Sequence, residues 1–276
     1  MQKFKRKPPQ VSEYKYSPAP DEIKDFNQLR VLEGIPVLIK KLDGSSLETD
    51  FFEVTSEDKR LFYSGVPVKE IKYIVFYAPP PVFRNYFDPT PEHPLNARIK
   101  KWIGREEITA FLFDQEQLIG ILQAHLPYSI VISPSNISGS FYVIMKHAMW
   151  MWGGRGLKRF IPYFNAQISN LKEAGKYKRF LGWRSSKSYL KHDLSKKLFF
   201  HVFYKHVLIA YTIERIAILG EARDLTRSYL GLRLYYRDRG KKSSVYSLVL
   251  RHALSGFRVV HRARIAPLIL EKSHSS

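Results

Sequence analysis

A proline-rich stretch about a third of the way along the chain most limits how this sequence can fold. Six prolines lie within residues 79–94: Pro79, Pro80, Pro81, Pro89, Pro91 and Pro94. Proline fixes the backbone φ angle and has no amide proton, so this stretch cannot belong to a regular sheet throughout. We therefore predict a linker over residues 79–91 that separates one small unit at 21–78 from a second at 92–152.

The first segment has the pattern of a short helix followed by a strongly bent, five-stranded antiparallel sheet. An apolar residue at every third or fourth position predicts a helix over residues 21–30. The β-rich run at 35–42 ends in Asp43-Gly44, a dipeptide typical of hairpin turns. Further strands are predicted to begin at Leu47, Arg60 and Val66.

The second segment repeats the order of the first. Residues 95–102 suit a short helix, and Asp114-Gln115 occupies the place of the first turn. The predicted strands cover residues 108–113, 117–122 and 128–133, and residues 140–149 close the unit. Two copies of one β unit, each of about 55–60 residues, therefore account best for residues 21–152.

Three motifs of the second segment occur together in one known family. Leu95-Asn96-Ala97 lies in the predicted helix, Tyr128-Ser-Ile-Val-Ile in a strand, and Met145-Lys146-His147-Ala148 at the end of the strand run. In these motifs the segment resembles Hfq, the bacterial member of the Sm-like RNA-binding family, whose strand run ends in Tyr-Lys-His-Ala. The first segment looks like the same fold with a plainer pattern. We therefore expect tandem Sm-like small barrels, each preceded by a short helix, over about half of the chain.

The resemblance implies a mechanism of RNA binding. Units join edge to edge, strand against strand, until a ring closes, and single-stranded RNA lies on the faces of the ring. In a pocket for U-rich RNA, Tyr128 would stack on a base, and Lys146 and His147 would contact base and phosphate. His147 is alternatively a structural histidine. The opposite face would use Phe111, and a basic rim would use Arg98, Lys100 and Lys101.

The sequence also departs from the family pattern. The stretch His125-Leu126-Pro127-Tyr128 lacks the acidic residue of the family's Phe-Asp-Gln-Phe, and a short insertion lies around residues 133–136. In the first unit, Glu57 falls where the stacking aromatic is expected and Glu70 where the histidine is expected. That unit is predicted to keep the fold without the uridine pocket. Counting two units per chain predicts three chains in a six-unit ring.

Positive charge is concentrated in the second half of the chain. The 45 Lys and Arg against 25 Asp and Glu give a net charge of +20, divided as +1 over residues 1–150 and +19 over 151–276. A polyanion is the expected partner, and nucleic acid is the commonest polyanion. An anionic membrane surface fits less well, because the basic residues alternate with aromatic residues and do not form a compact cluster.

The basic region at 153–276 allows two interpretations. Tyr204-Lys205-His206-Val207 and Leu250-Arg251-His252-Ala253 both resemble the closing motif of the second unit, which indicates one or two diverged Sm-like units. The alternative is a separate α+β extension with helices near 186–197 and 205–219. In either case the cations and aromatics suit RNA binding, so Lys205, His206, Arg251 and His252 join the candidate RNA-binding residues.

Several classes of chemistry lack support in the sequence. The absence of cysteine excludes disulfides, a cysteine nucleophile and thiolate metal sites. There is no phosphate-binding glycine loop and no His-Glu-x-x-His, so we expect neither a cofactor nor a metal. The basic residues 1–20 lack the apolar run of a secretory signal, and the apolar run at 207–219 is too short and too charged to cross a membrane. We expect a soluble, cytoplasmic protein with a disordered N-terminal arm.

These observations predict a non-catalytic RNA-binding protein. It would act as an RNA chaperone or scaffold in post-transcriptional regulation, as a homo-oligomer or within a ribonucleoprotein complex. A second hypothesis is a ribonuclease that uses His206 or His252 as general base. A third is an assembly subunit that uses its β edges to build a larger particle without RNA. RNA cleavage by variants of the two histidines tests the ribonuclease hypothesis. Self-association without RNA tests the hypothesis of an assembly subunit.

Overall fold

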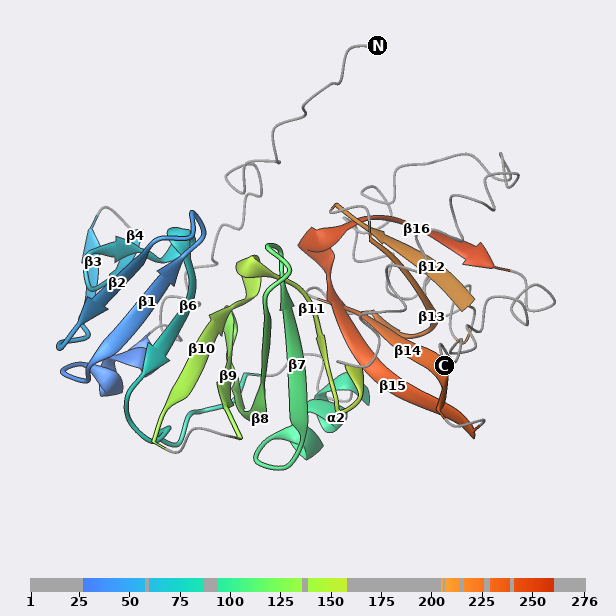
Figure 1. The fold of residues 1–276 in the computed structure, drawn as a ribbon, viewed down its shortest axis with the longest axis horizontal. Coiled ribbons are helices and arrows are strands. Elements are labelled where there is room, and N and C mark those ends of the chain that lie inside the picture. The colour runs from blue at the N-terminus through green and yellow to red at the C-terminus, as the bar shows by residue number, and fades with distance from the viewer. Residues whose placement is uncertain are drawn as a thin grey trace, which may run out of the picture.

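The computed structural model describes residues 27–57, 60–86, 94–135, 139–157, 205, 207–213, 216–225, 229–238 and 241–260. This part of the chain is mainly β (Figure 1). One sheet has 13 strands and a second has three. All of the strand pairs in both sheets are antiparallel. The predicted mainly β class is therefore confirmed.

The first unit contains six short strands. Its elements are the 3-10 helix η3 (Asn27–Leu32), β1 (Val37–Lys41), β2 (Ser46–Thr49), β3 (Val54–Glu57), β4 (Arg60–Tyr63), β5 (Val66–Pro67), the 3-10 helix η4 (Val68–Glu70) and β6 (Ile71–Phe76). Of the short helix predicted over 21–30, only residues 27–30 are described, and they belong to the 3-10 helix Asn27–Leu32. The predicted Asp43-Gly44 turn is confirmed: Gly44 has a φ of 90°, and the Asp43 carboxylate accepts the Ser45 amide proton at 2.8 Å.

The second unit follows the predicted order. Its elements are α2 (Pro94–Trp102), β7 (Glu107–Leu112), β8 (Gln117–His125), β9 (Ser129–Ser133), β10 (Phe141–Met145), the 3-10 helix η5 (Lys146–Ala148) and β11 (Met149–Gly153). The predicted helix and first three strands are confirmed to within a few residues. The stretch 140–149, expected to close the unit, contains β10 and the first residue of β11, because the turn η5 separates the two strands and sends β11 to a different neighbour.

A third unit lies in the basic region. Its elements are β12 (Val207–Thr212), β13 (Ala217–Leu225), β14 (Tyr229–Asp238), β15 (Lys241–Leu250), the 3-10 helix η8 (Arg251–Ala253) and β16 (Leu254–Val260). The helix considered for residues 205–219 is wrong, since β12 and β13 form an antiparallel hairpin there. The helix considered for 186–197 lies outside the described residues.

The units are joined into one sheet by the same kind of strand pair. In the second and third units the order across the sheet is last, first, second, third and fourth strand: β11-β7-β8-β9-β10 and β16-β12-β13-β14-β15. The last strand of one unit pairs with the fourth strand of the next. We call the β6–β10 pair the first joint and the β11–β15 pair the second joint. The described strands thus run on from unit to unit in an arc, and do not close into separate barrels (Figure 1).

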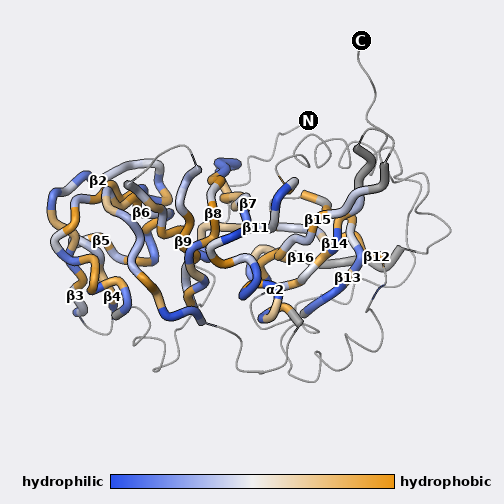
Figure 2. Tube along the Cα trace, turned by 90° about the horizontal axis from the view of Figure 1, so that it is seen from below, coloured by the Kyte–Doolittle hydropathy of each residue, from blue (hydrophilic) through white to orange (hydrophobic). Residues whose placement is uncertain are grey.

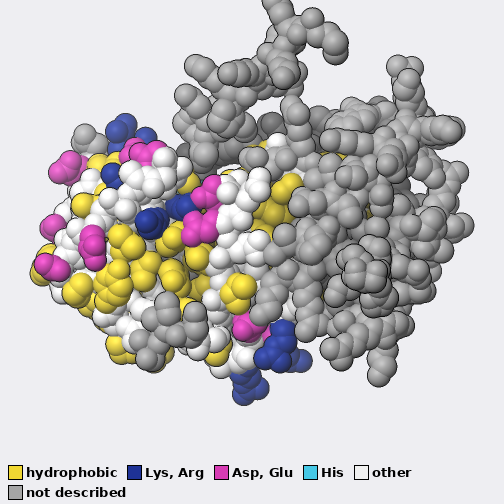
Figure 3. All heavy atoms as spheres, in the orientation of Figure 1, with side chains coloured by type: hydrophobic (Ala, Val, Ile, Leu, Met, Phe, Trp, Pro, Cys, Tyr) yellow, Lys and Arg dark blue, Asp and Glu magenta, His cyan; other side chains and the backbone are white. Residues whose placement is uncertain are grey.

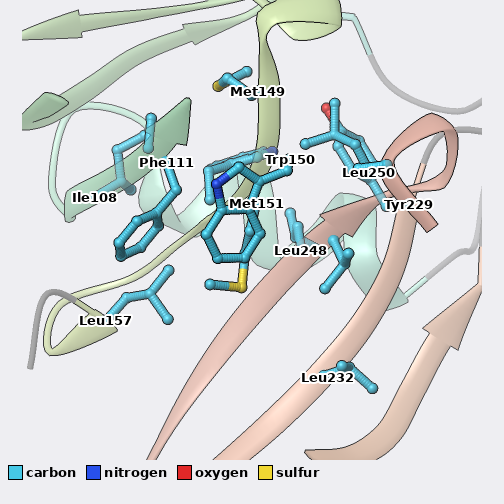
Figure 4. Close-up of a cluster of buried hydrophobic side chains, with 14 of the residues drawn as sticks. Ile108, Phe111, Met149, Trp150, Met151, Leu157, Tyr229, Leu232, Leu248 and Leu250 are labelled. Atoms are coloured by element: carbon cyan, nitrogen blue, oxygen red, sulfur yellow. The ribbon is translucent and has the colours of Figure 1, made fainter. Parts of the chain in front are cut away.

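Two hydrophobic clusters pack on opposite sides of the first joint. Alternate residues of β6 point to opposite faces, so Ile74 joins a cluster formed by the first and second units, while Val75 joins a cluster formed mainly by the second and third units. The Phe76 and Phe141 rings stack across the joint with centroids 4.9 Å apart. Figure 2 shows that hydrophobic residues run through the strands of the sheet, and Figure 4 shows side chains of one of the two clusters. Burial of apolar side chains from both partners therefore stabilises the joints.

Candidate nucleic-acid interface

The closing turns place a histidine at each joint. His147 is the second residue of η5, and its Nε2 lies 2.8 Å from the carbonyl oxygen of Ile71, the first residue of β6. His252 is the second residue of η8, and its Nε2 lies 3.0 Å from the carbonyl oxygen of Met149, the first residue of β11. Each histidine therefore contacts the same position of the preceding unit. We call this pair the clasp histidines.

Both clasp histidines are neutral at pH 7. Burial lowers the pKa of His147 from 6.5 to about 4, although its hydrogen bond to Ile71 acts in the opposite direction. Burial also lowers the pKa of His252 to about 4, with a further small decrease caused by His147. A neutral ring whose Nε2 hydrogen is donated to a main-chain carbonyl supplies no positive charge for a phosphate. In this arrangement the two rings hold units together.

Lys146 turns away from its neighbour His147 and toward the second joint. Its side-chain ammonium donates hydrogen bonds to the carbonyl oxygens of Leu126 and Pro127, the latter at 2.9 Å, and lies 3.1 Å from Nε2 of His125. It also lies 5.5 Å from the centre of the Tyr229 ring of the third unit. Only 3% of the residue is exposed, and burial lowers its pKa well below the usual value. The two predicted pocket residues thus serve two different joints.

His125 is the central residue of this buried polar cluster. Its Nδ1 lies 2.7 Å from the carbonyl oxygen of Tyr86, and its Nε2 lies 3.0 Å from the Tyr229 hydroxyl. If Nδ1 carries the proton donated to Tyr86, then the Lys146 ammonium and the Tyr229 hydroxyl share the single lone pair of Nε2. The ring also stacks on Trp152 at 5.9 Å. His125 therefore connects the linker, the second unit and the third unit.

His125 was not identified as a site residue from the sequence. It stands at the end of β8, and a histidine needs polar partners once it is buried. Burial, together with the charge of Lys146, lowers the pKa of His125 well below 6.5. The partners come from residues 39 and 104 positions away, so sequence spacing could not identify them.

Tyr128 and Phe111 are covered by protein. Tyr128 is 8% exposed, and its carbonyl oxygen accepts the Lys146 amide proton at 2.7 Å. Phe111 is 3% exposed, and its ring centre lies 5.2 Å from that of Trp150 (Figure 4). A base could stack on either ring only after the surrounding side chains moved. Base stacking on these two residues stays a prediction.

The cations of helix α2 divide into two sets. The Arg98 guanidinium lies 4.0 Å over the Tyr246 ring of the third unit, so Arg98 packs within the chain. Lys100 and Lys101 are exposed, and so are Arg105 in the following turn and Arg155 after β11. The Arg155 amide donates to the Glu106 carboxylate at 2.9 Å, which places Arg155 beside that turn. We call Lys100, Lys101, Arg105 and Arg155 the α2 patch, and Figure 3 shows Lys and Arg side chains gathered at the lower edge of the molecule.

The two motifs of the basic region, Lys205-His206 and Arg251-His252, lie at opposite ends of the third unit. Lys205 is exposed and precedes β12, and its amide donates to the Ala222 carbonyl at 2.9 Å. His206 lies outside the described residues. The Lys205-His206 pair therefore precedes a unit, whereas the pair Arg251-His252 closes one. The His252 ring contacts Met149 and Phe113, and a role of His252 as general base stays a prediction.

The closing turn of the first unit begins one residue earlier than the sequence comparison assumed. Its 3-10 helix starts at Val68, directly after Pro67, just as η5 starts at Lys146 after Met145. Lys69 therefore occupies the position of His147, and Glu70 occupies the position of Ala148. The first unit has no preceding unit among the described residues, and it has no clasp histidine.

A charged cluster adds to the first joint. The Lys72 ammonium of β6 lies 2.5 Å from both the Asp114 and the Glu116 carboxylates of the second unit. The Tyr73 hydroxyl donates to Glu116 at 2.8 Å. Burial alone would lower the pKa of Lys72, but the hydrogen bonds to the two carboxylates raise it above its usual value. Complementary charge therefore reinforces the pairing of the first two units.

Within the described ranges, no three His, Asp or Glu side chains lie close enough together to hold a metal ion. No helix in the same ranges is long and apolar enough to cross a membrane. Comparison with protein-family models, curated proteins and solved structures finds no match to this chain.

Proposed function

We propose that this protein is a non-catalytic, cytoplasmic RNA-binding protein in which three tandem Sm-like units form a continuous scaffold. The observation that carries the proposal is the strand order, which recurs along the chain with the units joined edge to edge. The Sm-like resemblance implies this way of joining. The net charge of +20 supports a polyanionic partner.

The α2 patch is the proposed RNA contact within the described residues. Lys100, Lys101, Arg105 and Arg155 are exposed. The chain continues from there into residues 158–204, which contain 11 Lys and Arg against two Asp and Glu. Lys146 and the clasp histidines are engaged in the joints. We therefore propose that affinity comes mainly from phosphate contacts, and that sequence preference is weak.

A charge-matched pair of variants tests whether the α2 patch is the RNA contact. The first variant carries Lys100→Gln, Lys101→Gln and Arg105→Gln in the α2 patch. Its control carries Arg30→Gln, Lys69→Gln and Arg84→Gln, which remove three exposed cations from the first unit and linker. We expect the patch variant to bind single-stranded RNA about tenfold more weakly at 0.15 M salt, with a salt slope smaller by about 2. The control should change affinity less than twofold, and an equal loss in both variants would refute the location.

Oligomerisation is a separate part of the proposal. Three chains per ring follow from two units per chain, but the described strands form three units. A six-unit ring would therefore contain two chains. The mass of the nuclease-treated protein in solution distinguishes two chains from three.

A further inference from the structure

The last strand of each unit has two edges, and in the first two units both edges are paired. β6 pairs with β1 of its own unit and with β10 of the next unit, and β11 pairs in the same way with β7 and β15. β16, the last strand of the third unit, pairs with β12, and no described strand lies along its other edge (Figure 1). This free edge of β16 therefore has the position at which the two earlier units receive a strand from their neighbour.

The first unit of a second copy is unsuited to fill that position. β5 directly precedes η4, as β10 precedes η5 and β15 precedes η8, so β5 stands where the other units have their joining strand. The second joint uses residues 247–249, which end two positions before η8, and the corresponding residues of the first unit are 64–66. Ser64 and Gly65 have φ angles of 47° and 75°. Because positive φ angles belong to a tight turn and not to an extended strand, the series of units ends at the first unit.

The free edge of β16 is suited to pairing with its own copy. The strand has seven residues, contains neither proline nor an acidic residue, and has Arg258 as its one charged residue. A long edge strand with few charges is a site of association. Antiparallel pairing of two identical strands is symmetric about a two-fold axis. Pairing centred on Phe257 uses all seven residues and places Arg258 of each copy opposite Gly256 of the other, so that the two arginines do not face each other.

We propose that two copies of this chain join through their β16 edges into a two-fold symmetric dimer. The proposal goes beyond RNA binding and does not depend on it. The dimer contains six units in one open series, with the first unit of each copy at its two ends. Association therefore stops at two chains. A closed six-unit ring is the alternative, since it requires β16 of each copy to pair with the first unit of the other.

Lysine and glutamate at position 256 form a matched pair of variants, because both add a long charged side chain at the same backbone position. In the dimer, Gly256→Lys would face Arg258 of the other copy with a like charge, and Gly256→Glu would face it with an opposite charge. Like charges directly opposite each other destabilise strand pairing, and opposite charges stabilise it. We expect Gly256→Lys to dimerise about tenfold more weakly than Gly256→Glu in 50 mM salt. Sedimentation of the nuclease-treated variants over a concentration series measures both constants, and equal constants would overturn the proposal.

Cross-linking provides a second test if the charged variants fail to fold. The chain has no cysteine, and Phe257→Cys would place two thiols on the two-fold axis. Residues directly opposite each other in an antiparallel pair have Cα atoms about 4.5–5.5 Å apart, which a disulfide can bridge. We expect mild oxidation to join Phe257→Cys chains in pairs and to leave Ser64→Cys chains single. Phe257→Cys chains that stay single, or a mixed disulfide between Phe257→Cys and Ser64→Cys chains that indicates a ring, would overturn the proposal.

Discussion

Replacing Lys146 by methionine is expected to destabilise the protein by about 3–5 kcal/mol. Methionine retains most of the apolar length of the lysine side chain but has no N–H donors. The carbonyl oxygens of Leu126 and Pro127 and the Nε2 of His125 would lose a donor in a site that is closed to water. Equilibrium unfolding in urea, followed by tryptophan fluorescence, measures the loss.

Lys100→Met is the matched control, because Lys100 is exposed on α2. It should change the free energy of unfolding by less than about 0.5 kcal/mol. The pH dependence of the stability provides an independent check on the burial of Lys146. The pKa of Lys146 in the folded protein lies below 10.5, so the unfolded chain binds a proton that the folded chain does not, and stability should fall as the pH falls below about 10.5. Lys146→Met should lack this dependence, and equal stability of Lys146→Met and the unmodified protein would contradict the assignment.

Gly153→Ala is expected to cost about 3 kcal/mol by separating the strands of the second joint. Gly153 lies between Thr109 of β7 and Ser247 of β15. A Cβ atom there would lie 2.5 Å from the Tyr246 carbonyl oxygen and 2.9 Å from the Ser247 Cα. Both are backbone atoms of a paired strand, so the clash with the added Cβ atom is removed only if β15 moves away from β11.

The neighbouring glycine provides the control for this prediction. A Cβ atom on Gly154 would meet only side-chain atoms, 3.3 Å from the Glu106 carboxylate and 3.5 Å from the Trp102 ring. Gly154→Ala should therefore cost less than about 1 kcal/mol. Urea unfolding and thiol protection at Ser247→Cys compare the two variants. Similar losses in both would show that the close approach at Gly153 does not determine the stability of the joint.

Local sequence signals predicted the second unit well because they act over a few residues. Short runs rich in apolar and β-branched residues predicted the strands from 108 to 133, and the helix at 95–102 was apparent from its own sequence. The β12–β13 hairpin was harder to predict. Its apolar run from Val207 to Leu219 is interrupted by two charged residues, a pattern that also suits a helix, and strand pairing decided the outcome.

The roles of the candidate site residues depend on contacts between units. Lysine is seldom fully buried, so nothing near Lys146 in the sequence indicated a buried ammonium. The hydrogen-bond partners of Lys146 and His147 depend on which strands pair at each joint. Tyr229 is 104 residues from His125, and Ile71 is 76 residues from His147. A motif can identify such residues as unusual without showing whether they contact RNA or another unit.

We propose that this chain binds RNA mainly through its positive charge. Fluorescence anisotropy of a labelled single-stranded U-rich RNA, titrated with nuclease-treated protein at 50 and 200 mM salt, tests it most directly. Six or more phosphate contacts predict that affinity falls at least about 100-fold between the two conditions. The absence of binding at 50 mM salt, or an affinity that is unchanged at 200 mM salt, would contradict the claim.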